Sequence, residues 1–285
     1  MSNLERRYRR LLGVLPRWYR RDREEEMVGI FLAERTDELD LEHSWPGWAE
    51  TWSTLGLAVR THLAAGAALT RVPDGARWRG EVVRALGVLG LLLGVFYAGA
   101  AITGLVLGEV TWVQLFELAP IAAFVLLLAG ERTPAKVAAG LVVVPVAVAL
   151  VDQAHVLVWA AFQVPWLVTF ACLCLGFHRE APTPPARRLA WWGGGAVVLG
   201  LAAGLATGAG LLAVVLLAVV VRVVAFVRGD VVLGRALAVF AVLMLGPVAV
   251  LAQGEVAGFA VGAAVVLVLS AVAPMRRRAV GLGVS

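Results

Sequence analysis

After residue 84 the sequence consists mainly of apolar runs of about 20 residues, separated by short polar connections. A run of this length crosses the hydrocarbon core of a bilayer as an α-helix. We therefore predict an all-α, polytopic helical membrane protein with an eight-span transmembrane bundle over residues 84–273. The predicted spans are residues 84–107, 111–130, 134–151, 154–177, 189–206, 209–227, 232–252 and 255–273.

The composition agrees with this class. Hydrophobic residues make up 60% of the chain and charged residues only 16%, with a mean hydropathy of +0.84. A soluble domain is nearer half apolar and a quarter charged, so a soluble enzyme, a disordered chain and a disulfide scaffold are excluded. Cys172 and Cys174 lie two residues apart in an apolar run and point to different helix faces, so we interpret them as core residues.

The charges of the connecting loops predict the topology. Loops on the side of the N-terminus carry basic residues, namely Arg132, Lys136, Arg179, Arg187, Arg188, Arg228, Arg235, Arg276, Arg277 and Arg278. Loops on the opposite side carry Glu109, Asp152, His155 and Glu255, and no Lys or Arg. Basic loops remain in the cytoplasm. The alternation predicts that both termini are cytoplasmic, the C-terminus as a basic tail over residues 274–285.

The formal net charge of +5 has a membrane interpretation. Basic residues next to transmembrane helices contact anionic lipid, so we expect no direct nucleic-acid binding. No apolar secretory signal opens the chain, which predicts that the N-terminal segment stays in the cytoplasm. Lys136 is the single lysine among 25 basic residues, and this arginine bias is typical of a GC-rich bacterial genome. We therefore predict a multi-pass protein of a bacterial plasma membrane.

Residues 1–70 predict a small cytoplasmic domain of three amphipathic helices, followed by an interfacial linker over residues 71–83. Helical spacing places apolar residues on one face of each helix. In the first these are Leu4, Tyr8, Leu11, Leu12 and Leu15, in the second Tyr19, Met27, Ile30 and Phe31, and in the third Trp48, Trp52, Leu55, Val59 and Leu63. Pro16 separates the first two helices, and Ser44 is the expected N-cap of the third.

The second helix carries charges of both signs in blocks, at Arg20, Arg21, Arg23, Glu24, Glu25 and Glu26. Surfaces of this kind select partners by charge complementarity, which favours a partner-docking role. The alternative interpretation is a solvated helix face whose charges pair with one another at i, i+4.

Three strings in this region carry a family resemblance: Tyr8-Arg-Arg-Leu-Leu, Leu15-Pro-Arg-Trp-Tyr-Arg20, and Glu24-Glu-Glu-Met27 with Phe31-Leu32. Residues 4–32 resemble the opening of actinobacterial membrane proteins that begin with a HAAS-like domain, a helical signalling domain associated with helix-turn-helix regulators. The resemblance implies a signalling role in transcription regulation, with a PadR-like winged-helix regulator or another cytosolic regulator as the partner.

Polar residues near the predicted outer surface form a second candidate site. An outward-facing polar pocket would comprise Gln114, Glu117, Asp152, His155 and Gln163. Polar groups inside a membrane are costly, so such a pocket could bind a proton, a cation or a small cationic ligand. The alternative is that Glu117 pairs locally and the loop residues are hydrated. One histidine with carboxylates from separate loops has no metal-site spacing, and we expect neither a metal nor another cofactor.

No nucleophile–base arrangement or paired carboxylates indicate an enzyme. The leading hypothesis is a non-enzymatic membrane regulator or sensor. The alternatives are a transporter or the membrane subunit of an ABC-type exporter with an ABC ATPase partner, and a structural partner of another membrane protein. Gly200 and Gly204 form a small-xxx-small pair, which predicts close helix packing.

Overall fold

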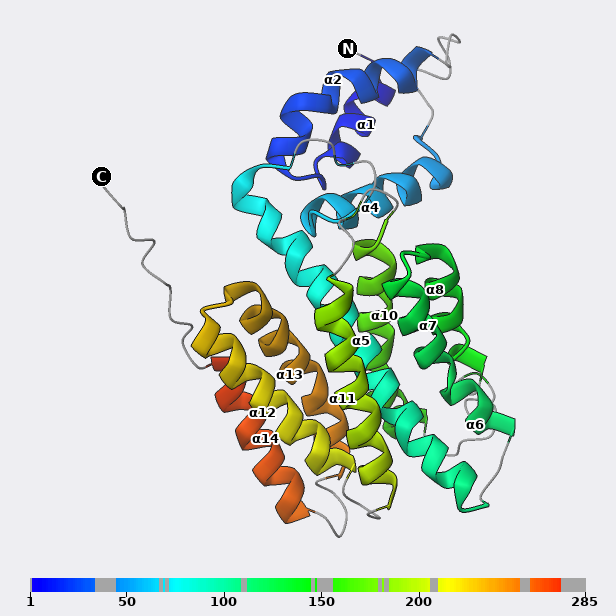
Figure 1. Cartoon of the computed structure of the whole chain (residues 1–285). Helices are drawn as coiled ribbons and strands as arrows, with labels where there is room; N and C mark the ends of the chain where they lie inside the picture. Colours follow the sequence, from blue (N-terminus) through cyan, green and yellow to red (C-terminus); the bar gives the residue numbers. More distant parts are fainter. Residues whose placement is uncertain are drawn as a thin grey trace. The chain divides into compact units, whose positions relative to one another are not determined.

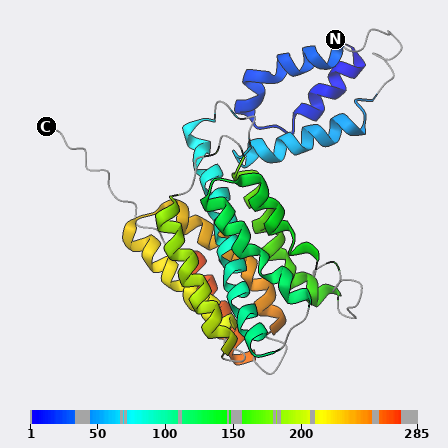
Figure 2. The same ribbon diagram turned by 45° about the vertical axis from the view of Figure 1, so that its right-hand side comes forward.

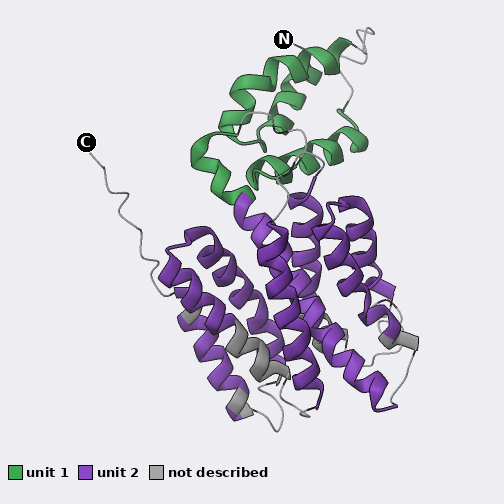
Figure 3. Ribbon diagram, in the orientation of Figure 1, with its two compact units in different colours: residues 1–80 green, residues 81–285 purple. Residues whose placement is uncertain are grey.

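The computed structural model describes residues 2–33, 45–66, 69, 72–108, 112–144, 147, 156–178, 181, 185–205, 210–251 and 257–272 (Figure 1). Every regular element in these ranges is an α-helix, so the all-α prediction is confirmed for the described part of the chain. The chain divides into two compact units, which we call the head, Met1–Gly80, and the body, Glu81–Ser285 (Figure 3).

The head begins with a helical hairpin of α1, Asn3–Leu12, and α2, Arg17–Ala33. Ser2 caps α1, because its Oγ accepts a hydrogen bond from the Glu5 N–H at 3.1 Å. The turn ends at Pro16, whose carbonyl accepts the first hydrogen bonds of α2. The predicted apolar face of the first helix is confirmed: its members are buried or pack against the core at Leu4, Tyr8, Leu11, Leu12 and Leu15.

The core of the head lies between this hairpin and α4, Trp48–His62. The Tyr8 and Phe31 rings stack at 3.9 Å between centroids. Two predictions are wrong. Ile30 is 62% exposed instead of facing inward. The third helix begins at Trp48 with Gly47 as its N-cap, and Ser44 lies outside the described residues.

Helix α5, Asp74–Val106, begins within the predicted linker. Its first turns lie against the C-terminal end of α4 within the head. The Arg79 guanidinium donates to the His62 carbonyl at 3.2 Å. A Cβ added at Gly80 would lie 2.4 Å from the Ala64 carbonyl oxygen, so this close approach requires glycine.

The body contains helices that run side by side in both views (Figures 1 and 2). Besides α5 they are α6, Trp112–Glu117; α7, Ala119–Leu128; α8, Arg132–Gly140; α10, Val156–Gly176; α11, Ala186–Leu205; α12, Gly210–Arg228; α13, Val231–Leu251; and α14, Ala257–Val272. In the described part of the chain, three helices have the length and apolar character to cross a membrane: Asp74–Val106, Ala186–Leu205 and Val231–Val250. This finding is compatible with a membrane location.

Three long apolar helices are fewer than the eight predicted spans. The second apolar run is divided at Leu118 into α6 and α7, directly ahead of Pro120, which lacks a backbone donor. In the third run, α8 ends at Gly140. Shorter apolar helical stretches occur at Leu115–Leu128, Phe162–Gly176 and Ala260–Leu269. The remaining parts of the predicted spans include residues or side chains outside the described set.

Glycines bring α5 close to two neighbours. Against α10, a Cβ at Gly90 would lie 2.1 Å from the Thr169 Oγ1. Against α11, a Cβ at Gly200 would lie 2.0 Å from the Phe96 carbonyl oxygen, and one at Gly204 would meet Thr103. Thr103 Oγ1 also donates to the Leu201 carbonyl at 3.1 Å. The predicted close packing at Gly200 and Gly204 is therefore confirmed.

Two arginines bind backbone carbonyls in the body. Arg132, at the start of α8, donates to the carbonyls of His178 at 2.7 Å and Ala181 at 2.6 Å. Arg222 in α12 donates to the Gly234 carbonyl at 2.8 Å and is only 7% exposed. The guanidinium of Arg222 thus links α12 to the first turn of α13.

Candidate functional site

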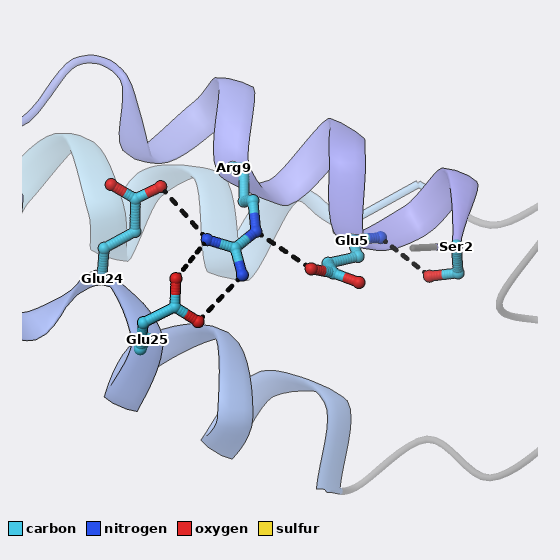
Figure 4. Close-up of polar contacts among 5 residues, drawn as sticks. All are labelled: Ser2, Glu5, Arg9, Glu24 and Glu25. Atoms are coloured by element: carbon cyan, nitrogen blue, oxygen red, sulfur yellow. Dashed lines mark hydrogen bonds and ion pairs between the residues drawn. The ribbon is translucent and has the colours of Figure 1, made fainter.

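The predicted docking residues lie on α2, and two of them face α1 (Figure 4). The Arg9 guanidinium pairs with carboxylates of both helices. It binds Glu25 with two hydrogen bonds of 2.7 and 2.9 Å and approaches Glu24 at 3.5 Å. Its Nε donates to Glu5 in α1 at 3.0 Å. Glu24 and Glu25 therefore fix the hairpin in addition to any role they have toward a partner.

The bidentate pair shifts the pKa of both Arg9 and Glu25. The Glu25 hydrogen bonds and charge raise the pKa of Arg9 above its usual range. Arg9 in turn lowers the pKa of Glu25, first through the hydrogen bonds and then through its charge. Because planar guanidinium–carboxylate pairing is geometrically specific, this contact adds to the apolar core in aligning α1 against α2.

The other predicted docking residues remain largely at the surface. Arg23 pairs with Glu26 along the same helix at 2.8 Å, and Arg21 lies 3.8 Å from Asp22. Arg20 differs, because its Nε is buried and makes no hydrogen bond with any residue that the structure describes. The charged blocks thus combine pairing within the head with an exposed row of both signs at Arg21, Asp22, Arg23 and Glu26.

Helix α4 exposes several large apolar side chains. Its side toward the hairpin is made by Thr54, Ala58 and Thr61, which are buried. The opposite side is exposed and carries large apolar residues. We call this exposed set the α4 face: Trp48 (73% exposed), Trp52 (67% exposed), Leu55 and Val59.

Sequence periodicity placed the members of the α4 face on one side of the helix, but it did not show that this side points away from the core. A hydrophobic pattern assigns the large apolar residues to a core, and here the core contact uses small ones instead. Thr61 and Thr54 fit between the helices because they are short, and the Thr61 Oγ1 binds its own helix at the Leu57 carbonyl, 2.9 Å away. The useful signal was this second stripe of small residues, at the same helical spacing on the opposite side.

The predicted outward-facing polar pocket is only partly described. Asp152 and His155 lie outside the described residues, as does the side chain of Gln114. Glu117 is the last residue of α6, at the break before α7. Gln163 lies in α10, two residues before the buried Pro165. Neither Glu117 nor Gln163 forms a hydrogen bond or ion pair with a described residue, so the structure does not join them into one site.

No group of three His, Cys, Asp or Glu side chains that could hold a metal ion occurs among the residues the structure covers. Comparison with known proteins finds no match: no family model, no curated protein and no solved structure is similar to this chain.

Proposed function

We propose that this chain is a non-enzymatic membrane regulator or sensor of eight spans, whose head docks a cytosolic regulatory protein. The α4 face carries the proposal. A monomeric domain seldom leaves two tryptophans and two aliphatic side chains exposed on one helix, and such patches mark interaction surfaces. Tryptophan is also among the residues that contribute most to protein–protein binding.

The directions of the body helices support the eight-span topology. The glycine contacts pair Phe96 with Gly200 and Thr103 with Gly204, so α5 and α11 run parallel. The contacts pair Gly87 with Leu173 and Gly90 with Thr169, so α5 and α10 run antiparallel. In the eight-span topology, spans one and five cross the membrane in the same direction and span four crosses in the opposite direction. The helices α5, α11 and α10, which correspond to spans one, five and four, have these relative directions. Arg132 also joins two loops that the topology assigns to the cytoplasmic side.

The charge of the head favours a protein partner over the membrane surface. Residues 1–80 contain 13 Arg and 12 Asp and Glu, so their net charge is close to zero. An anionic bilayer attracts clusters of basic residues, and the head offers no such excess. The exposed apolar side chains of the α4 face instead match the apolar centre of a protein interface. The HAAS-like resemblance implies that the partner is a PadR-like winged-helix regulator.

Site-specific photo-crosslinking in cells tests this proposal. A benzophenone amino acid replaces Trp52 on the α4 face, or Ile30, an exposed apolar residue of α2, as the matched control. We expect the probe at residue 52 to yield a covalent adduct with a winged-helix protein, and we expect Trp48→Ser to reduce it about tenfold or more. Adducts with lipid alone at residue 52, or equal protein adducts at residues 52 and 30, would contradict docking through the α4 face.

A second candidate function, transport, is supported by the break at Leu118. Discontinuous helices with a polar group at the break form ion and substrate sites in transporters. Glu117 lies at such a position. Ion or proton flux into proteoliposomes that is lost in Glu117→Gln would favour transport, and flux unchanged by this substitution would remove the residue from the pathway.

A further inference from the structure

The body contains a groove of about 790 Å³ between α5, α11, α12 and α13. Its middle is apolar, and the lining there includes Leu89, Leu92, Trp192, Leu233, Leu237 and Phe240. This volume is in the range of sites that enclose a small ligand or part of a larger one. The groove belongs to neither predicted site.

The charged residues of the groove lie at one end. On α5, Glu81 and Arg84 line the groove nearest to the N-terminal end of the helix. Arg188 is in the first turn of α11, and Asp230 directly precedes α13. Leu89, Trp192 and Leu233 pack together on the cluster of Val221, Ala225 and Leu237, which places these points of α5, α11 and α13 at the same level. Because α5 and α11 run parallel, their first turns are at the same end, and the groove is ionic there and apolar farther along.

Three of these charged side chains have no partner among the described residues. Glu81, Arg84 and Arg188 form neither a hydrogen bond nor an ion pair with any of them. Asp230 is partly used, because its Oδ1 accepts the Leu233 N–H at 2.9 Å and caps α13. The ionic end therefore offers two guanidinium groups and one carboxylate to a ligand.

The groove opens on the outside of the helices. Trp191 at its edge is 79% exposed, and Leu199 farther along α11 is exposed as well. An apolar opening of this kind faces acyl chains when the body is in a bilayer. A ligand that enters through it is itself a membrane component.

We propose that the groove binds one zwitterionic aminophospholipid of the cytoplasmic leaflet. Arg84 and Arg188 hold the phosphate, Glu81 holds the ammonium group, and an acyl chain lies along Leu92, Leu237 and Phe240. Guanidinium groups bind phosphate oxygens with charge-assisted hydrogen bonds. The carboxylate of Glu81 accepts N–H hydrogen bonds from an ethanolamine ammonium group, which selects this headgroup over choline, which has no N–H donor, and over glycerol, which carries no cation. This inference rests on the membrane-embedded body but not on the docking role of the head.

Two neighbouring glycines provide a matched test of the apolar part. Gly194 and Gly195 are adjacent in α11, and a Cβ at either would meet no atom within 4 Å. Only Gly195 lines the groove. Gly195→Phe fills the groove, whereas Gly194→Phe adds the same side chain outside it. Arg84→Gln with Arg188→Gln removes the phosphate ligands, and Arg187→Gln with Arg228→Gln removes two arginines that do not line it.

The readout is native mass spectrometry of full-length protein from nanodiscs with equal amounts of phosphatidylethanolamine, phosphatidylglycerol and phosphatidylcholine. We expect one retained phosphatidylethanolamine per chain, reduced about tenfold in Gly195→Phe and in the Arg84/Arg188 variant and unchanged in both controls. Equal loss in test and control variants, no retained lipid, or equal retention of all three lipids would overturn the proposal. Membrane fractionation of the same variants separates this outcome from a failure of the body to insert.

Discussion

The helix pairs α1–α2 in the head and α5–α11 in the body are held together in opposite ways. In the head, large side chains fill the interface: Tyr8 stacks on Phe31, and Arg9 bridges the helices to Glu25. In the body, the absence of side chains at Gly200 and Gly204 lets the backbones meet. Water drives apolar side chains together, as at α1–α2. A bilayer provides no such drive between helices, so close packing of the kind seen at α5–α11 takes its place in the proposed membrane-embedded body.

Adding a side chain to the body contact should have the largest effect. In Gly200→Leu the new side chain starts 2.0 Å from the Phe96 carbonyl oxygen, a backbone atom that cannot move aside, so α5 and α11 separate. The smaller change Gly200→Ala should destabilise by about 1–3 kcal/mol or more. Thermal unfolding in detergent with size-exclusion chromatography measures both. Gly194→Leu is the control, and equal unfolding temperatures for the two leucine variants would refute the glycine contact.

Removing a side chain from the head contact should have the next largest effect. Leu12 is fully buried among the side chains of the core, so Leu12→Ala should destabilise the head by about 2–5 kcal/mol. Hydrogen exchange of α1 and α2 amides in the full-length protein reports this locally. Val14→Ala, at an exposed position of the following turn, should leave exchange unchanged. If both substitutions accelerate exchange alike, the core assignment is wrong.

A smaller effect is expected from the hydrogen bond between the Tyr8 hydroxyl and Glu50, at 2.9 Å. Burial, and then this carboxylate, raise the pKa of Tyr8, so its phenol stays protonated at alkaline pH. Tyr8→Phe keeps the ring stack and should cost about 0.5–1.5 kcal/mol. Hydrogen exchange in α4 is the measurement, with Tyr19→Phe as the control. If the hydrogen exchange of the α4 amides is unchanged in Tyr8→Phe, the hydrogen bond to Glu50 does not stabilise α4.

The smallest effect should come from Arg9→Gln, because its bidentate partner Glu25 is exposed and salt screens the pair. Its pH dependence is distinctive. Arg9 lowers the pKa of Glu25, so the pair stabilises the hairpin above the ordinary value of 4.5 and loses this contribution as the pH falls through the lowered pKa. Exchange in the wild type should therefore approach that of Arg9→Gln at low pH or high salt. A difference that persists under both conditions would point to packing by the Arg9 side chain.

Local patterns predicted the parts of the fold that depend on one helix at a time. The apolar face of α1 follows from spacing alone, as does the small-residue contact of Gly200. Ile30 and the α4 face were misjudged because amphipathic spacing shows which residues share a side but not which side is covered. The helix break at Leu118 was missed because apolar content continues through it.

The candidate site residues show the same limit. Glu24 and Glu25 were recognised as an unusual acidic block, but their partner Arg9 lies in another helix and no spacing rule connects them. The groove in the body was not predicted, because its charged end combines single residues from three helices. Such sites depend on which helices become neighbours, and that information is spread over the whole chain.

The exposed tryptophans of α4 also have a consequence for the amount of protein that a cell can accommodate. An uncovered apolar patch associates with other uncovered copies as its concentration rises. Under the docking proposal, the partner is what keeps each copy apart. Synthesis of this chain in excess of the partner should then produce clustered, slowly cleared protein in the membrane, and we expect the expression of the two genes to be matched.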